Sequence, residues 1–142
     1  MPPVAAVVVL LWMGALSSYD VIQRRLPNWL TLPGAVVILL GAAVAGRGWP
    51  ALAGAAALGA TYLLVHLATP AAMGAGDVKL AIGLGALTGC FGAGVWCLAG
   101  LGAPLLTALW ALFAVLRRSG TAVPHGPSMC LASVAAVALA FA

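Results

Sequence analysis

Residues 93–116 read AGVWCLAGLGAPLLTALWALFAVL, and this stretch decides the fold. It carries no charged side chain and exceeds the roughly 20 residues that an α-helix needs to cross a bilayer. Apolar runs of the same kind lie on both sides, separated by short breaks rich in polar residues, glycine or proline. The weakest break is G-C-F-G at 89–92. The pattern predicts six spans, near residues 2–18, 29–46, 51–69, 78–91, 93–116 and 126–142.

The composition points to the same environment. Of 142 residues, 65% are hydrophobic and only 6% are charged, whereas a soluble domain has about 25% charged residues. So few charges cannot cover a water-facing surface, but an apolar exterior is what lipid requires. We therefore predict an all-α, polytopic integral membrane bundle of about six transmembrane helices. It should form a single membrane-embedded domain over residues 1–142.

The basic residues indicate the orientation of the chain. Arg24 and Arg25 follow the first apolar run, the reverse of the order in a signal peptide, so residues 2–18 are interpreted as a retained helix. Basic loops favour the cytoplasm. The loop after the second span contains only Arg47, so the bias predicts an outside N-terminus and cytoplasmic odd-numbered loops. These odd-numbered loops contain Arg24, Arg25, Lys79, Arg117 and Arg118.

The net charge of +4 does not indicate a nucleic-acid partner, because the basic residues are scattered and form no stripe. Three cysteines, Cys90, Cys97 and Cys130, have neither paired nor metal-ligand spacing. We therefore expect no metal site, no disulfide framework and no cofactor.

The sequence contains just two acidic residues, Asp20 and Asp77. Two predicted spans separate them, so both should lie at the same membrane face, which the charge bias makes cytoplasmic. Two close carboxyl groups share a proton, so that one activates a water and the other protonates a carbonyl oxygen. Alternatively, Asp20 pairs with an arginine of the following loop, and Asp77 caps its helix and pairs with Lys79.

The residues around the two aspartates separate these alternatives. Residues 20–28 read D-V-I-Q-R-R-L-P-N, and residues 74–79 read G-A-G-D-V-K, with glycines that permit close backbone approach. Together they resemble the prepilin peptidases, or type IV leader peptidases. These membrane aspartic proteases have D-x5-[IL]-P-N after one helix and G-x-G-D-x-K two helices later. Residues 124–127, P-H-G-P, resemble the family's P-x-G-P turn before the last helix.

The resemblance implies that Asp20 and Asp77 are the catalytic pair of a membrane aspartic endopeptidase. It would cleave the leader of prepilin-like substrates at the cytoplasmic face of the plasma (inner) membrane. Its partners would be that substrate and the lipid bilayer. The length resembles the short tight-adherence or Flp-type members, which lack the C-x-x-C segment associated with methylation. The residues expected to bind substrate or support the site are Gly74, Gly76, Lys79, Pro27 and Asn28.

Two other functions remain open from the sequence. One is a non-enzymatic scaffold or small transporter, with Asp20 and Asp77 as ion-pair or proton-relay groups. The other is a protease like presenilin and signal peptide peptidase, because Tyr19-Asp20 and G-x-G-D resemble that group. No P-A-L segment accompanies them near the C-terminus.

Further interpretations concern single positions. Asn28 should cap the second helix, and Gly85-x-x-x-Gly89 should allow close helix packing. His66 should bond across helices, and His125, where the family commonly has an aromatic residue, should be a solvated loop histidine. Lys79 should balance the charge of the aspartates or extend to the headgroups. The five tryptophans should lie mostly at the membrane interfaces.

Overall fold

The computed structural model describes residues 3–71, 73–118 and 123–141. Within them the chain forms six helices, which confirms the all-α prediction. The predicted ends of the first and last spans, residues 2 and 142, and part of the loop at 117–127 lie outside the described residues. The helices are α1 (Pro3–Gln23), α2 (Asn28–Val44), α3 (Gly48–Ala68), α4 (Ala75–Gly89), α5 (Ala93–Leu116) and α6 (Gly126–Leu139).

The helix boundaries follow the breaks in the sequence. The fourth and fifth predicted spans are separate helices, and Gly92 between them has φ +107°, a conformation that favours glycine. Helix α1 continues to Gln23, beyond the predicted span, so Asp20 lies in its last turn. In the described part of the chain, α1, α3 and α5 are long and apolar enough to cross a membrane, while α2 and α6 are shorter apolar helices.

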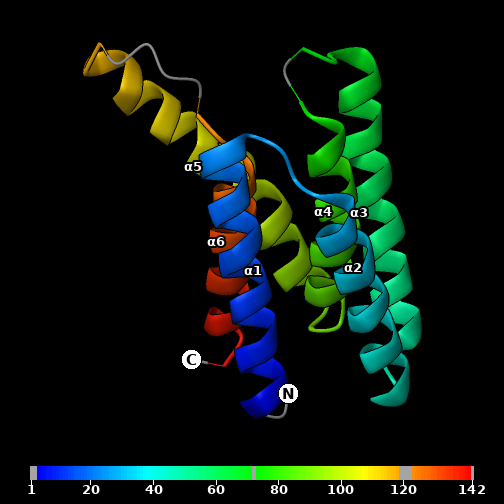
Figure 1. The fold of residues 1–142 in the computed structure, drawn as a ribbon. Helices are drawn as coiled ribbons and strands as arrows, with labels where there is room; N and C mark the ends of the chain where they lie inside the picture. The colour runs from blue at the N-terminus through cyan, green and yellow to red at the C-terminus, as the bar shows by residue number, and fades with distance from the viewer. Residues whose placement is uncertain (1–2, 72, 119–122, 142) are drawn as a thin grey trace.

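Successive helices run in alternating directions, which brings the two ends of the chain to the same end of the molecule (Figure 1). The helices form two groups, with α2, α3 and α4 on one side and α1, α5 and α6 on the other. The closest packing is between α3 and α4, followed by α5 and α6. Helix α4 joins the groups because it also contacts α5 and α6.

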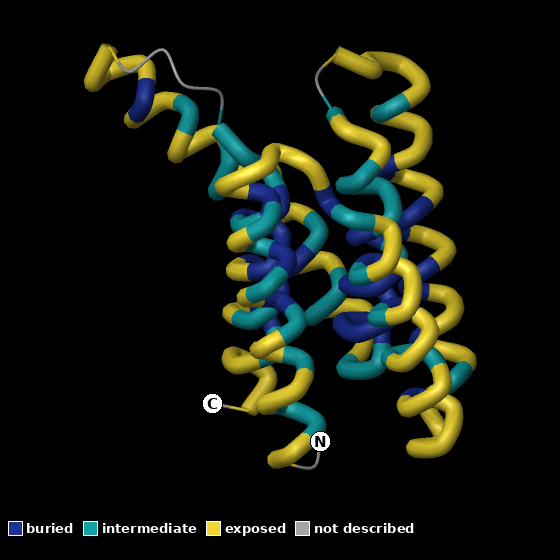
Figure 2. The backbone as a smooth tube through the Cα atoms, in the orientation of Figure 1, coloured by how far each residue is buried: buried dark blue, intermediate teal, exposed yellow. Residues whose placement is uncertain are grey.

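Helix α4 is the most buried helix, from Leu80 to its end at Gly89 (Figure 2). Its crossing with α3 depends on glycine. A Cβ atom on Gly85 would lie 2.5 Å from the carbonyl oxygen of Gly54, and one on Gly89 would lie 2.6 Å from that of Pro50. The prediction of close packing at Gly85 and Gly89 is therefore confirmed.

Trp12 fills the space between the two groups. The backbones of α1 and α4 do not adjoin among the described residues. The half-buried indole of Trp12 instead lies against Gly34 of α2 and Gly83 of α4 and donates a hydrogen bond to the Leu30 carbonyl, 2.8 Å away. Trp12 is thus an interior contact rather than an interfacial anchor. Trp96 likewise donates to the Gly54 carbonyl at 3.0 Å.

Candidate active site

Asp20 is buried in the last turn of α1, with 8% of its surface exposed. Its Oδ2 atom accepts a hydrogen bond from the backbone N–H of Gly126, 2.9 Å away. Gly126 is the first residue of α6, where an N–H has no acceptor within the helix and the helix dipole favours an anion. A Cβ atom on Gly126 would lie 2.7 Å from the same carboxylate oxygen, so this contact requires glycine.

Asp77 is held by its own turn at the start of α4. Gly74 is the N-cap residue, and its N–H donates to Asp77 Oδ2 at 3.2 Å. Glycine has no side chain to complete a capping box, so the reciprocal bond runs from the Asp77 N–H to the Gly74 carbonyl, at 3.1 Å. Asp77 therefore caps its helix, as one of the sequence alternatives predicted.

The acidity of Asp77 is altered by its surroundings. Asp77 precedes the apolar run at 78–91 and lies outside it. Burial, and secondarily the negative charge of Asp20, raise its pKa to about 6, while the hydrogen bond from Gly74 opposes the rise. Near neutral pH this carboxyl group therefore exchanges its proton easily.

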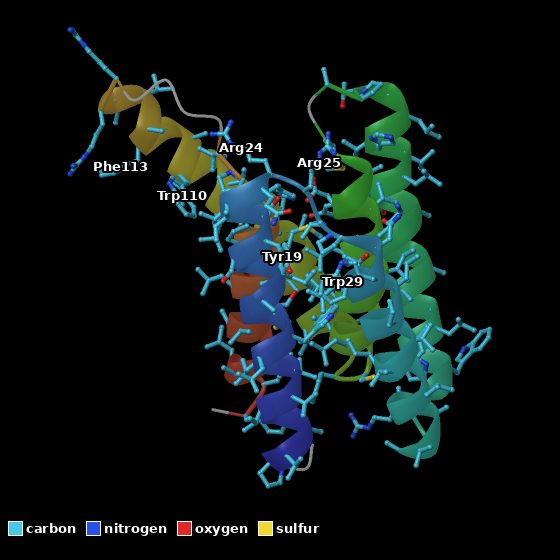
Figure 3. The ribbon with its side chains drawn as sticks, viewed as in Figure 1. Tyr19, Arg24, Arg25, Trp29, Trp110 and Phe113 are labelled. Atoms are coloured by element: carbon cyan, nitrogen blue, oxygen red, sulfur yellow. The ribbon has the colours of Figure 1, made fainter. Side chains whose placement is uncertain are left out.

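A pocket of about 260 Å³ is lined by both aspartates. The loop between α1 and α2 and the start of α4 meet around it. Arg24 and Arg25 lie at the same end of the molecule as the pocket (Figure 3). The residues lining the pocket are Asp20, Arg24, Arg25, Leu26, Asn28, Gly74, Ala75, Gly76, Asp77 and Lys79.

Lys79 and Asn28 link two sides of this pocket. The ammonium group of Lys79 donates to Asn28 Oδ1 at 2.6 Å, so the resolved bond of Lys79 goes to an amide and not to Asp77. Asn28 is already the first residue of α2, and Pro27 occupies the N-cap position without a side-chain cap. The interpretation of Asn28 as an N-cap is wrong, because its side chain faces α4 instead.

The glycines before Asp77 differ in what they permit. A Cβ atom on Gly76 would lie 2.9 Å from the Cβ of Leu26, so glycine lets the α1–α2 loop pack on α4. At Gly74 an added Cβ would meet only the Asp77 carboxylate at 3.5 Å and the Gly76 nitrogen at 3.9 Å. Gly76 is thus required by packing, whereas Gly74 acts through its N–H.

Both histidines are more tightly held than their sequence positions suggested. The ring of His125 is half-buried, with Nε2 3.1 Å from the Tyr62 hydroxyl and Nδ1 2.6 Å from the Thr107 hydroxyl. The solvated-loop interpretation of His125 is wrong. His66 Nδ1 donates to the Met73 carbonyl at 2.7 Å, which fixes the loop before Gly74 instead of bridging two helices.

Sequence reasoning missed the contact of Gly126 with Asp20. The P-H-G-P motif marked the segment, but a hydrogen bond between residues 106 positions apart leaves no local signal. Within the described residues, no group of three or more His, Cys, Asp or Glu side chains could hold a metal ion.

Comparison with known families identifies the chain. Residues 7–141 match the type IV leader peptidase family, a range that contains the motif segments at 20–28, 74–79 and 124–127. No curated protein and no solved structure matches the chain. The apolar helices and the match agree on a multi-pass membrane protein. The chain therefore belongs to the type IV leader peptidase family, the aspartic-type membrane peptidases that process prepilins.

Proposed function

We propose that this peptidase removes the leader of type IV prepilin-like substrates at the cytoplasmic face of the plasma membrane, with Asp20 and Asp77 as its catalytic pair. The observation that carries the proposal is that both carboxyl groups line one pocket. They also interact, since the charge of Asp20 contributes to the raised pKa of Asp77. Interacting carboxyl groups favour a pair with a single proton.

The surroundings of the two groups suggest how they divide the work. Asp20 accepts a hydrogen bond from the Gly126 N–H, which holds its carboxyl group in place, and Asp20 is the proposed general base toward a water. Asp77, with a pKa of about 6, is the proposed acid toward the scissile carbonyl oxygen. Water then adds to the carbonyl carbon, one proton passes to Asp20, and the Asp77 proton passes to the oxygen. Asp20 then gives its proton to the scissile nitrogen while Asp77 takes a proton back from a hydroxyl of the tetrahedral intermediate, so the C–N bond breaks and the pair again holds one proton. The titration belongs to the pair.

The other expected site residues are proposed to shape the pocket rather than to react. Lys79 and Asn28 connect α4 to α2 through their 2.6 Å hydrogen bond. Gly76 admits Leu26, and the Gly74 N–H orients Asp77. Pro27 is the N-cap residue of α2, and its carbonyl accepts the N–H groups of Leu30 and Thr31.

The two alternative functions have less support. The family match gives no support to a scaffold or transporter. Tyr19, which resembles part of the presenilin Tyr-Asp pair, packs edge-to-face on Trp29 at 5.9 Å between ring centroids (Figure 3). Tyr19 does not line the pocket, so a role there like that in the presenilin group has no geometric basis.

We further propose that all six helices span the membrane as one domain over residues 1–142, with the N-terminus outside. Arg47, in the loop on the other side, has a structural role: its Nη1 donates to the Cys90 carbonyl at 2.6 Å, at the end of α4. A cation is stabilising at a helix C-terminus. The lone basic residue in that loop therefore does not argue against the orientation.

Cleavage of a synthetic prepilin tests the catalytic pair. The purified protein in proteoliposomes is incubated with a substrate that has a basic leader and an apolar helix, and products are followed by mass spectrometry. Asp20→Asn and Asp77→Asn should each lower kcat roughly a thousandfold or more, because Asn cannot carry the shared proton. Ser18→Ala, in the same helix as Asp20, is the control. Near-normal cleavage by either Asn variant would refute the pair.

Thiol labelling tests the orientation. In a cysteine-free background, a cysteine at Gln23 should react with a membrane-impermeant reagent only in inverted vesicles, and a cysteine at Gly48 only in intact cells. A cysteine at Ser119, which lies outside the described residues, should behave like that at Gln23. The opposite labelling pattern would invert the orientation, and disagreement between positions 23 and 119 would contradict the six-span count.

A further inference from the structure

A directed chain of hydrogen bonds runs through His125. The Thr107 hydroxyl donates its single hydrogen to the Ala103 carbonyl at 3.0 Å. The same oxygen lies 2.6 Å from His125 Nδ1, and when the hydroxyl hydrogen is on the Ala103 carbonyl, Nδ1 is the donor of this contact. His125 Nε2 is then the acceptor for the Tyr62 hydroxyl at 3.1 Å. The neutral ring satisfies all three groups at once.

This series of hydrogen bonds ends next to the residue that binds Asp20. His125 is the residue before Gly126, whose N–H donates to Asp20. The contact has little tolerance, because Gly126 approaches the carboxylate so closely that a Cβ atom would lie 2.7 Å from it. His125 does not line the pocket itself. Its ring can therefore influence Asp20 only through the position of the backbone at 126 or through its charge.

The hydrogen bonds of His125 also connect the two groups of helices that hold the aspartates. Tyr62 belongs to α3, which packs tightly on the Asp77 helix, α4. Thr107 belongs to α5, and His125 precedes α6, which packs on the Asp20 helix, α1. Direct contact between α3 and α5 is limited in the described part of the chain. The Tyr62 and His125 rings, 5.7 Å apart, add a contact between the groups to the Trp96–Gly54 hydrogen bond and the packing of α4 on α5 and α6.

We propose that His125 is a positioning residue: held between Tyr62 and Thr107, it keeps the start of α6 in the place where the Gly126 N–H binds Asp20. This inference rests on the proposed function of Asp20. In this arrangement of hydrogen bonds the ring is neutral, with its proton on Nδ1. Protonation of Nε2 would displace the Tyr62 hydroxyl hydrogen and place a positive charge near Asp20.

The surroundings favour the neutral ring. Burial lowers the pKa of His125, and the negative charge of Asp20 opposes this. The groups that face the ring are Asp20 from α1, Tyr62 from α3 and the uncharged Thr107 from α5.

Kinetics on the full chain in proteoliposomes provide the first test. His125→Phe keeps a ring but loses both hydrogen bonds. It should lower kcat about tenfold to hundredfold with little change in KM, as expected from a misplaced reacting group. The pH profile of kcat should shift as well. His125→Gln, which offers one donor and one acceptor, should recover part of the loss. The double variant Tyr62→Phe/His125→Phe should show no larger loss of kcat than His125→Phe alone, because both substitutions break the same hydrogen bond.

Thr61→Val is the matched control for Thr107→Val. Both threonines bond to a carbonyl of their own helix, Thr61 to Ala57 at 2.8 Å, but of the two only Thr107 also bonds to His125. Thr107→Val should therefore reduce kcat and shift the pH profile, whereas Thr61→Val should do neither. Equal behaviour of the two variants would overturn the proposal.

A spectroscopic test does not depend on activity. His125-Gly126 is the only His-Gly dipeptide in the sequence, so labelling His carbonyl carbons and Gly nitrogens yields one NMR signal, that of the Gly126 amide. Tyr62→Phe and Thr107→Val should move its proton upfield, as the bond to Asp20 weakens. An unmoved signal in both variants would disprove the positioning role. If Asp20→Asn is inactive while His125→Phe is normal, this inference fails alone; if Asp20→Asn is active, the proposed function fails first.

Discussion

Asp20 and Asp77 line the same pocket but are held there by different kinds of contact. Asp77 accepts its hydrogen bond from Gly74, three residues earlier in the same turn. Asp20 accepts its bond from Gly126, 106 residues away at the start of another helix. The first contact forms whenever α4 begins at this point. The second requires α1 and α6 to be correctly packed, so the geometry of Asp20 depends on the whole bundle.

This difference predicts unequal effects for two similar substitutions. Gly126→Ala should lower kcat/KM about a hundredfold, because the new Cβ would lie 2.7 Å from the Asp20 carboxylate and displace it. Gly74→Ala should change kcat/KM less than about threefold. The backbone of Gly74, at φ −74°, suits alanine, and the atom nearest to the new Cβ, Asp77 Oδ2, would be 3.5 Å away. Cleavage assays on both variants measure this ratio. Equal losses would mean that the two carboxyl groups are held alike.

The comparison also predicts how the two groups titrate. The chain has only two acidic side chains, so labelling Asp Cγ with ¹³C gives two titration curves. One should have an apparent pKa of about 6, assigned to Asp77 by its loss in Asp77→Asn. In Asp20→Asn this pKa should fall, because the neighbouring charge is removed. Two curves at ordinary aspartate values would contradict the interaction.

The same shift gives a sign for stability. The pKa of Asp77 is raised from 3.8 to about 6, so the folded protein binds this proton more tightly than the unfolded chain. The favourable contribution is complete below about 3.8 and is lost as the pH rises through 6. The thermal stability of Asp77→Asn relative to the native chain should therefore increase over this range. A constant difference between pH 4 and pH 7 would be inconsistent with the shift.

A smaller effect is expected from the Lys79 to Asn28 hydrogen bond. Both residues belong to the tightly packed α2, α3 and α4 group, where Gly76 and Leu26 already hold the same segments together. Lys79→Met removes one hydrogen bond, worth about 1 kcal/mol. If this whole free energy is lost from the transition state, kcat/KM should fall roughly fivefold. Lys79→Arg, which keeps a donor, is the control. A loss as large as that of Asp77→Asn would instead give Lys79 a part in the charge chemistry.

The smallest effect should come from the cysteines. None of Cys90, Cys97 and Cys130 lines the pocket that holds the aspartates. Their combined replacement by alanine should leave kcat/KM within about twofold, and chelators should have no effect on cleavage. Inhibition by a chelator, or inactivity of a well-folded cysteine-free variant, would contradict a mechanism based on two carboxyl groups alone.

Much of this architecture was predictable from local patterns. Apolar runs and their breaks predicted the six helices, including the doubtful break before α5, because each helix must satisfy its own backbone in lipid. The motif segments around Asp20 and Asp77 predicted the family, which the match over residues 7–141 confirms. The membrane orientation and the assignment to the short Flp-type members stay predictions.

The contacts that complete the site were not predictable in this way. Asn28 faces Lys79 instead of capping α2, His125 is enclosed by Tyr62 and Thr107, and Trp12 lies between helices rather than at an interface. Each of these side chains has polar groups that several environments could satisfy. The choice among them depends on which helix lies opposite, and sequence spacing does not contain that information.

The sequence by itself determined the apolar helices, the presence of two acidic groups, and the local turn that holds Asp77, because these depend on neighbours within a few residues. Only the tertiary structure decided that Asp20 binds Gly126, that Trp12 and His125 lie between the two groups of helices, and that both aspartates line one pocket. The physical reason is that packing and burial act between segments far apart in the chain. These forces set the distances and the acidity that a catalytic pair needs.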